Sequence, residues 1–249
     1  PLALASRLPA GVLATGAAVE AVALEPDGGV AVATAAGGVR GRVAVLALPP
    51  RLAVATIAFT PALPPAVREA ADALHTWMGD TVKAVAVFDD AFWRRAGLAG
   101  AAISHAGPFG ELHDHSGPGP GQAALFGFAQ AARLAGLEPG AIGAAFVDQL
   151  ERLFGREARA ATAVHVVDWS REPGTATPDS PRDGSYAYGP PILRAPHLEG
   201  RLAFASTETA AAFGGHVEGA ILAGRRAAAQ ALELLAEPRA SREQASSTP

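Results

Sequence analysis

The hydrophobic pattern of this chain changes its period repeatedly, and that alternation limits the possible folds more than any single motif does. Strands are predicted at 19–24, 30–34, 42–48, 81–88, 101–104, 123–128, 164–168 and 202–204. Apolar residues recur there at every second position, as in 30–34 and 81–88, or form a nearly continuous run, as in 42–48. Spacing of three and four residues, typical of amphipathic helices, occupies 64–76, 141–154 and 216–235. Strands and helices thus share one chain, so the predicted class is α/β (α+β mixed), with mixed sheets.

The composition excludes several classes of protein. With 249 residues, 49% of them hydrophobic, the chain is long and apolar enough to bury a core. Its net charge of -4, without a basic cluster, argues against nucleic acid or a lipid surface as partner. No stretch reaches the roughly 18 apolar residues of a membrane span, and no basic segment precedes an apolar one at the start. We therefore expect a soluble, cytoplasmic protein.

Turn residues divide the chain. Pro49-Pro50 ends the strand 42–48, which we predict to be the last of a β-meander, buried on both faces. Residues 105–121 are rich in Gly, Pro and His and are predicted to form a loop or hairpin. The His113-Asp114-His115 run resembles a metal clip, but only two imidazoles converge in it, so no metal site is predicted.

Two features point to chemistry. Lys83 is the single lysine among 20 basic residues, which indicates a position where a compact ammonium is needed and a guanidinium does not serve. The segment from Ser206 leads through Gly214-Gly215 into the predicted helix 216–235. A helix entered through glycines lets a ligand approach its free amides, which favour an anion or an oxygen gaining negative charge.

Several motifs resemble the flavin-containing amine oxidases, whose best-known members are the monoamine oxidases. The signature near the C-terminus is Phe204-Ala-Ser-Thr-Glu-Thr-Ala210 followed by Gly215-His-Val-Glu-Gly-Ala-Ile221. Further agreement, in the same order along the chain, comes from 43–50, 57–65, 78–83, 91–94, 168–169 and 184–186. The resemblance covers about residues 8–236, and motifs in a shared order are more specific than any one of them.

The resemblance implies a division into domains and a set of site residues. Residues 1–62 and 184–236 would belong to an FAD-binding domain, 63–183 to a mixed-sheet substrate domain, and 237–249 to a disordered tail. The residues implied in catalysis are Lys83, Tyr186 and His216. Those implied in FAD binding are Val19, Trp169, Ser206, Thr207, Glu208, Gly215, His216 and Val217.

Each implied role has a chemical reason. Lys83 would hold a water, or dioxygen, beside the flavin, and Trp169 would shield the ring from solvent. Tyr186 would form one wall of the amine site, and His216 replaces the tyrosine that monoamine oxidases carry at the other wall. Ser185 stands where those enzymes attach flavin through cysteine, and the chain has no cysteine, so FAD would be bound non-covalently. We expect the helix tip at 216, the amine of Lys83 and the indole of Trp169 to converge on one flavin.

The implied function is oxidative deamination of a small-molecule amine, with hydride transfer to FAD and reoxidation by O2 to give H2O2. The Gly-x-Gly-x-x-Gly unit that holds the FAD pyrophosphate is missing, so the chain resembles a C-terminal fragment of such an enzyme. The alternatives are a related flavin desaturase or protoporphyrinogen-type oxidase, and a non-catalytic remnant that acts as a binding module. A homodimer is the assembly that we consider.

Overall fold

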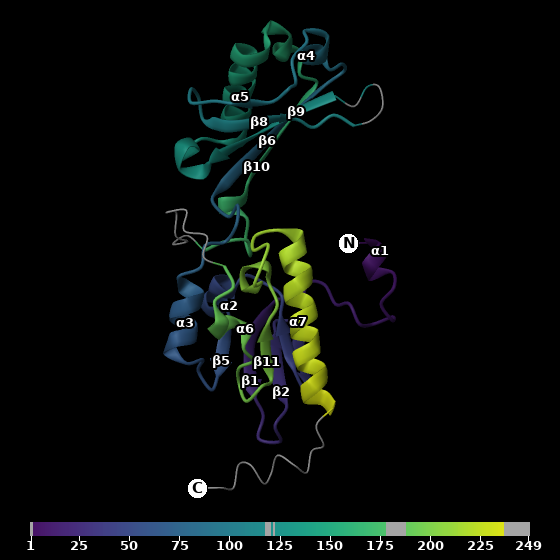
Figure 1. Cartoon of the computed structure of the whole chain (residues 1–249), viewed down its shortest axis with the longest axis vertical. Coiled ribbons are helices and arrows are strands. Elements are labelled where there is room, and N and C mark those ends of the chain that lie inside the picture. Colours follow the sequence, from purple (N-terminus) through teal and green to yellow (C-terminus); the bar gives the residue numbers. More distant parts are fainter. Residues whose placement is uncertain (1, 118–120, 122, 178–187, 237–249) are drawn as a thin grey trace. The chain divides into compact units, whose positions relative to one another are not determined.

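The computed structural model describes residues 2–117, 121, 123–177 and 188–236. The chain divides into two compact units, one formed by Pro1–Thr76 with Asp183–Pro249 and the other by Trp77–Arg182 (Figure 1). The first division lies later than the predicted one at 62/63. Residues 63–76 belong to the first unit because the apolar side chains of Leu63, Val67 and Leu74 pack into its core.

The first unit contains two sheets. One is mixed and has the strand order β3-β2-β1-β5, in which β5 runs parallel to β1 and the other neighbours are antiparallel. The other is a parallel pair, β4 with β11. The bounds are β1 Val19–Leu24, β2 Val30–Thr34, β3 Gly37–Gly41, β4 Ala44–Leu46, β5 Ala58–Thr60 and β11 Leu202–Phe204.

The prediction that 42–48 closes the meander, buried on both faces, is wrong. That segment forms the shorter β4, which leaves the meander and pairs with β11, where Leu202 and Phe204 are fully buried, and its central Val45 is exposed. The third strand of the meander is instead β3, whose residues are all exposed. Its exposure explains why hydrophobic alternation did not reveal it.

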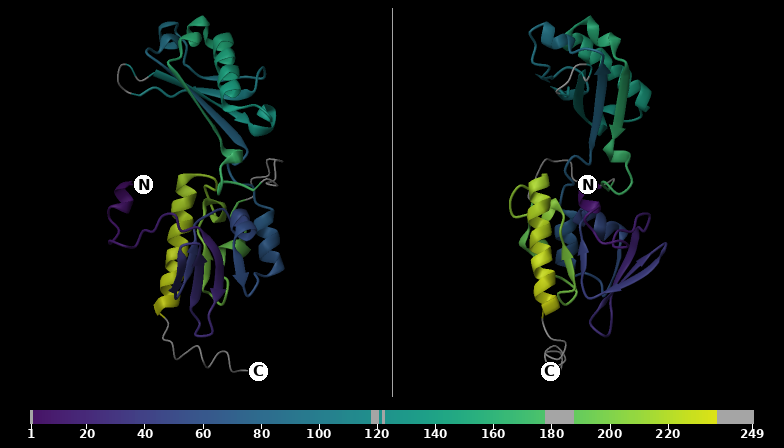
Figure 2. Two further views of the ribbon diagram at one scale, coloured as in Figure 1. Left: turned by 180° about the vertical axis from the view of Figure 1, so that it is seen from behind. Right: turned by 90° about the vertical axis from the view of Figure 1, so that its right-hand side faces the viewer.

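The first unit also contains helices. They are α1 Leu2–Ala5, α2 Pro50–Thr56, α3 Pro65–Asp72, α6 Pro191–Arg194, the short 3-10 turn η4 Thr207–Thr209, and α7 Val217–Ala236. Prolines in the first turns of α2, α3 and α6 fit there because those amides have no partner within the helix. In Figure 2, α7 runs beside β11, and the hairpins of β1 to β3 lie on the other side of the unit.

The second unit is one five-stranded sheet with α5 against it. The strand order is β10-β6-β9-β8-β7, and every pair of neighbours is antiparallel. We predicted a mixed sheet here. Strands β9 and β10 do run in the same direction, but β6 lies between them, so no neighbours are parallel. The bounds are β6 Thr81–Phe88, β7 Ala102–Ile103, β8 Phe109–Asp114, β9 Ala123–Gln130 and β10 Ala163–Asp168.

One face of this sheet forms the core of the unit. Side chains of α5 Pro139–Phe154, among them Phe146 and Leu150, pack on Val82, Ala84 and Leu125. Gln149 of α5 is fully buried and bonds both backbone groups of Phe109, its carbonyl accepting at 3.1 Å and its amide donating at 2.7 Å. The smaller elements are α4 Phe92–Arg95, η1 Ala131–Leu134, η2 Arg156–Ala160 and η3 Trp169–Arg171.

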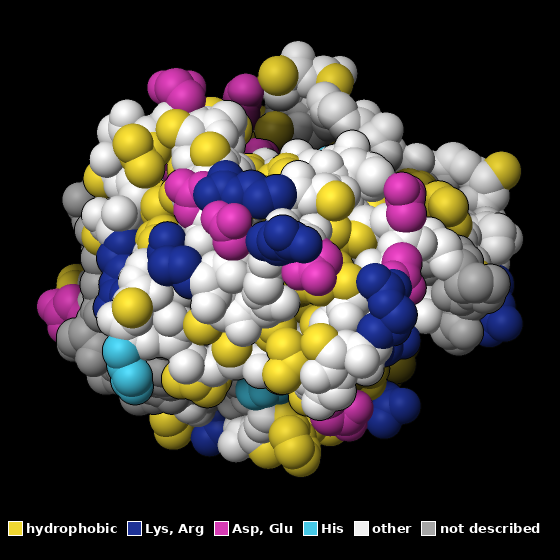
Figure 3. Space-filling view, turned by 90° about the horizontal axis from the view of Figure 1, so that it is seen from above, with side chains coloured by type: hydrophobic (Ala, Val, Ile, Leu, Met, Phe, Trp, Pro, Cys, Tyr) yellow, Lys and Arg dark blue, Asp and Glu magenta, His cyan; other side chains and the backbone are white. Residues whose placement is uncertain are grey.

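Charged groups are dispersed over the surface. Figure 3 shows basic and acidic side chains lying next to one another on the face that it draws. Arg159, for example, pairs with both Asp148 and Glu151. Within the described residues, no helix has both the length and the apolar character that crossing a bilayer requires.

Candidate functional site

The turn η4 presents buried polar atoms without partners. It follows directly on β11, whose three residues are all buried. Ser206 is 7% exposed and Glu208 is 3% exposed, yet Ser206 Oγ and Glu208 Oε2 have no hydrogen-bond partner among the described residues. A buried polar atom left unpaired costs about 1–3 kcal/mol, so such atoms indicate a ligand that would pair with them.

The first turn of α7 lies against η4. Thr207 Oγ1 donates to the carbonyl oxygen of His216 at 2.9 Å, and the His216 ring lies 2.9 Å from the Gly214 carbonyl through Nδ1. Gly215 has φ of 79°, a left-handed conformation that glycine adopts without strain. The first amides of α7 have no helical partners, so the positive end of the helix dipole is available to an anionic group.

A glycine allows this close approach. A Cβ at Gly219 would overlap the Phe213 carbonyl and lie 2.8 Å from Thr207 Oγ1. Only the absence of a side chain lets the loop before α7 fold back over the helix. The signature glycine thus sets the distance between α7 and η4.

Arg226 connects α7 by hydrogen bonds to β11 and η4, on which the helix packs. Its guanidinium donates to the carbonyls of Arg194 and Phe204, at 2.9 and 2.7 Å, and to Thr209 Oγ1 at 2.9 Å. Burial lowers the pKa of Arg226, and the neighbouring charge of Arg194 adds to that effect. Arg226 was not among the residues predicted from the sequence. The one sequence feature that could have pointed to Arg226 is its position on the same side of an alanine-rich helix as Ala223 and Ala227.

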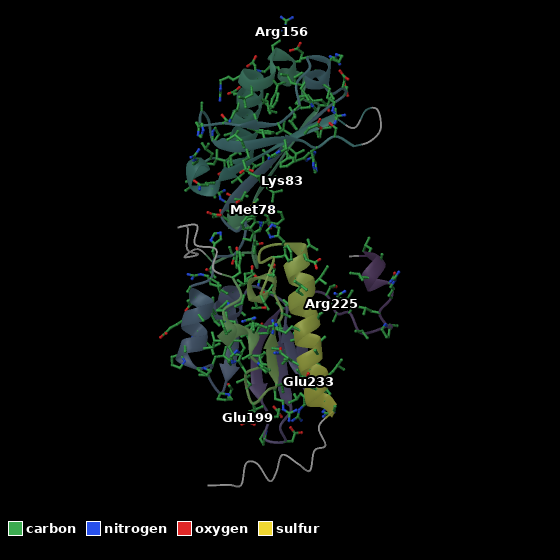
Figure 4. All side chains as sticks on the ribbon, in the orientation of Figure 1. Met78, Lys83, Arg156, Glu199, Arg225 and Glu233 are labelled. Atoms are coloured by element: carbon green, nitrogen blue, oxygen red, sulfur yellow. The ribbon has the colours of Figure 1, made fainter. Side chains whose placement is uncertain are left out.

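Lys83 lies in the second unit, on the sheet face opposite to α5. Figure 4 shows it on β6. Its Nζ lies 4.5 Å from the ring centroid of Phe126 and 5.6 Å from that of Phe128. Among the described residues no carboxylate forms an ion pair with it. The ammonium is therefore held by aromatic faces, which attract a cation without neutralising its charge.

Trp169 lies near Lys83 along the sheet. Val167 is the cross-strand neighbour of Lys83, and Trp169 begins η3 directly after β10 ends. The indole is 40% exposed. Asp168 fixes this turn, since its Oδ1 accepts from the backbone nitrogen of Ser170 at 3.0 Å. The flat indole face is thus available to another group.

The remaining predicted residues fall in different places. Val19, at the start of β1, is half-buried and packs against the core of the first unit. Val217 begins α7 and is 79% exposed. Tyr186 and Ser185 lie outside the described residues. The first unit contains the predicted residues of β1, η4 and α7, and the second unit contains Lys83 and Trp169.

Residues 105–121, predicted to form a loop or hairpin, contain the strand β8, which is antiparallel to both β7 and β9. His113 and Asp114 belong to β8, because Phe109 and Leu112 are buried and a register shift near 110 had obscured their alternation. Asp114 accepts from Trp93 Nε1 at 2.9 Å and Arg94 Nε at 2.8 Å. Burial alone would raise the pKa of Asp114, but hydrogen bonds from Ser116, Trp93 and Arg94 outweigh it and lower the pKa to about 2.

The donors and acceptors of the first unit fit FAD. Hydroxyl groups of a sugar-like chain would satisfy Ser206 Oγ and Glu208 Oε2, and the start of α7 would face an oxygen that gains negative charge. Residues of the first unit thus suit a nucleotide cofactor, and the second unit by itself carries a lysine beside two aromatic rings. Comparison with known proteins gives the family.

Residues 1–232 match the sequence profile described as flavin containing amine oxidoreductase. A Mycobacterium tuberculosis protein named as a flavin-containing monoamine oxidase is 35% identical over 214 residues, 83% of this chain and 45% of that protein. Cyclohexylamine oxidase from Brevibacterium oxydans IH-35A is similar in structure, with a TM-score of 0.71 and 28% identity over 87% of this chain. A putrescine oxidase bound to putrescine has a TM-score of 0.72 and 25% identity over the same share.

The chain belongs to the flavin-containing amine oxidoreductase family. This confirms the resemblance stated from the sequence and the fold class predicted with it. The chain spans about half the length of these relatives, 45% of the mycobacterial protein and 48% of each oxidase structure.

Proposed function

We propose that the protein containing this chain is an FAD-dependent amine oxidase, which deaminates a small amine and passes the electrons to dioxygen, forming hydrogen peroxide. The observation that carries the proposal is the pair of buried, unpartnered atoms Ser206 Oγ and Glu208 Oε2 beside the start of α7. Relatives named for the oxidation of cyclohexylamine and putrescine support amine oxidation. Because the chain has no cysteine, FAD is held without a thioether bond.

When bound at these residues, FAD would supply a hydride acceptor for the carbon that bears the amine. Ser206, Thr207 and Glu208 bind its hydroxyl groups, and Gly215 lets it approach the amides of His216 and Val217. The backbone of Val19 also contacts FAD. The amides of His216 and Val217 stabilise negative charge on the cofactor in a water-poor site.

The proposed roles at the reacting end belong to four side chains. Lys83 holds a water or dioxygen with a compact ammonium, and Trp169 excludes bulk water with its indole. Tyr186 and His216 flank the amine with flat faces. The amine reacts as the neutral base, because an apolar, desolvated site disfavours the ammonium form. The amine's carbon loses a hydride and its nitrogen a proton, and the resulting imine is hydrolysed by water.

The test uses the full-length protein that contains this chain, loaded with FAD. We expect amines to bleach the flavin absorbance anaerobically and to release peroxide in air. Turnover on non-amine substrates alone would indicate the desaturase or protoporphyrinogen-type alternative. Failure to take up FAD would overturn the proposal in favour of a non-catalytic binding protein.

A further inference from the structure

The amine nitrogen loses a proton in the proposed reaction, and the four side chains at the reacting end differ in whether they can accept it. The Lys83 ammonium and the Trp169 indole carry only donors. The phenol of Tyr186 keeps its own hydrogen near neutral pH and is a weak acceptor. His216 stands where monoamine oxidases carry a tyrosine, and a neutral imidazole always has one nitrogen with a lone pair. His216 is therefore the strongest proton acceptor of the four.

A hydrogen bond sets the tautomer of the His216 ring. Its Nδ1 lies 2.9 Å from the carbonyl oxygen of Gly214. Because a carbonyl oxygen can only accept, Nδ1 carries the hydrogen of the neutral ring and Nε2 carries the lone pair. A backbone carbonyl that binds Nδ1 is a common way to prepare Nε2 as a base or ligand. The basic nitrogen of His216 is thus Nε2.

The backbone of His216 is held on both sides of the ring's attachment point. Its amide donates to the Phe213 carbonyl at 3.1 Å, and its carbonyl accepts from Thr207 Oγ1 at 2.9 Å. The same carbonyl accepts from the Ala220 amide at 3.1 Å, the first hydrogen bond of α7. The residue is exposed in this chain, so a ligand can reach the ring. His216 thus combines a fixed backbone and a defined tautomer with access for a small molecule.

We propose that Nε2 of His216 is the base of the reaction and accepts the proton of the amine nitrogen. The inference rests on the proposed amine oxidase function and adds a catalytic role to the flat face of the same ring. The carbon–hydrogen bond breaks with its electron pair leaving as hydride for the cofactor, and the nitrogen lone pair forms the carbon–nitrogen double bond. The nitrogen–hydrogen bond breaks towards Nε2, which gives a neutral imine and an imidazolium. Water takes the proton from the imidazolium as the imine leaves.

The test measures how fast benzylamine, cyclohexylamine and putrescine bleach the flavin of the FAD-loaded full-length protein without air. His216→Phe keeps a flat ring and removes the acceptor, so the rate at saturating amine should fall about 10²-fold, a usual contribution of a general base. The Kd of the amine should change little. In His216→Ala, added imidazole should raise the rate about tenfold. Pyrazole, a ring of the same size but a far weaker base, should not restore it.

The matched control is His105→Phe, which removes an exposed imidazole from the second unit and should leave the rate and the Kd unchanged. A second measurement needs no activity. Nitrogen NMR of the FAD-free full-length protein, with isotope-labelled histidine, reports which ring nitrogen carries the hydrogen. The signals of His216 are those that vanish in His216→Phe, and they should show a hydrogen on Nδ1 and a bare Nε2 at pH 8.

The outcomes separate this role from the proposed function. If an amine bleaches the wild-type flavin and His216→Phe reacts as fast, or imidazole gives no rescue of His216→Ala, the role of His216 is overturned while amine oxidation stands. A hydrogen on Nε2 in the FAD-free protein overturns the role without any turnover. If none of the three amines bleaches the wild-type flavin, the proposed function fails, and the role of His216 fails with it.

Discussion

The Lys83 ammonium lies 4.5 Å from the centre of the Phe126 ring, with Phe128 as its direct cross-strand neighbour. Aromatic faces hold the cation in place and leave its hydrogen-bond donors available, unlike a carboxylate partner. This arrangement suits a group that stabilises negative charge developing on a small molecule.

Replacement of Lys83 by methionine should therefore slow the reaction with dioxygen far more than the reaction with amine. We expect the rate of reoxidation to fall about 10²-fold, as for the loss of one preorganised charged donor. Methionine also packs on aromatic rings, so the fold should be kept. Stopped-flow absorbance measures both half-reactions separately.

The matched control is Arg156→Met, which removes an exposed cation from the same unit (Figure 4). It should leave both rates unchanged. Equal losses in the two half-reactions of Lys83→Met, or no loss in either, would contradict the role assigned to the ammonium.

Replacement of Glu208 should stabilise the FAD-free protein and weaken its binding of FAD. Its Oε2 is buried without a described partner, which destabilises the protein when no ligand is present. Glu208→Gln should raise the free energy of unfolding of the FAD-free protein by about 1 kcal/mol and weaken FAD binding by about tenfold. Urea unfolding and fluorescence titration with FAD measure the two quantities.

Glu233→Gln is the control, because Glu233 is exposed on α7 (Figure 4) and should change neither quantity. A Glu208→Gln protein that binds FAD as tightly as the wild type would show that this carboxylate does not contact the cofactor.

Two glycines of α7 should respond in opposite ways to the same substitution. Gly219→Ala places a methyl group against the Phe213 carbonyl and Thr207 Oγ1, so it should destabilise the first unit by about 2 kcal/mol or more. Gly224→Ala meets nothing within 4 Å and should stabilise the protein by up to about 1 kcal/mol, the difference in helix propensity. Thermal unfolding of both variants makes the comparison, and a shared direction of change would refute the close approach of loop and helix.

Many helices and strands of this fold could be predicted from the spacing of apolar residues along the sequence. Strand 81–88 was predicted with its observed bounds because apolar residues occupy every second position from Val82 to Phe88, and the bounds of 202–204 were also predicted as observed. The helix 50–56 was missed. Pro49-Pro50 was taken only as the end of a strand, although the second proline also begins α2. The apolar run 52–54 that follows is too short to show a helical period.

The parts of the candidate site that are formed by residues close together in the sequence could be predicted. The helix predicted from about 216 agrees with α7, which begins at Val217, because a glycine-led helix is a property of neighbouring residues. The contacts of Arg226 with Arg194, Phe204 and Thr209 were not predictable, since these residues lie 17 to 32 positions away and come together only when α7 packs on β11 and η4. The full extent of the second unit's sheet was not predictable either, because 105–121 was predicted only as a loop or hairpin, without bounds for β8.

Asp114 should make the stability of the second unit depend on pH. Its pKa of about 2 in the folded protein lies below the usual value of 3.8, so the unfolded chain binds the proton more tightly. The contribution of the carboxylate is complete above about pH 5 and is lost as pH falls through 4 towards 2. It amounts to about 2 kcal/mol, because one pKa unit corresponds to about 1.4 kcal/mol.

Asp114→Asn should be less stable than the wild type at pH 7, and the difference should shrink as the pH is lowered from 5 to 3. Urea unfolding at a series of pH values measures this convergence. The control Asp89→Asn changes an exposed carboxylate in the turn after β6, and its curve should run parallel to that of the wild type. A constant offset between Asp114→Asn and the wild type over this range would mean that Trp93 and Arg94 do not stabilise the charged form of Asp114.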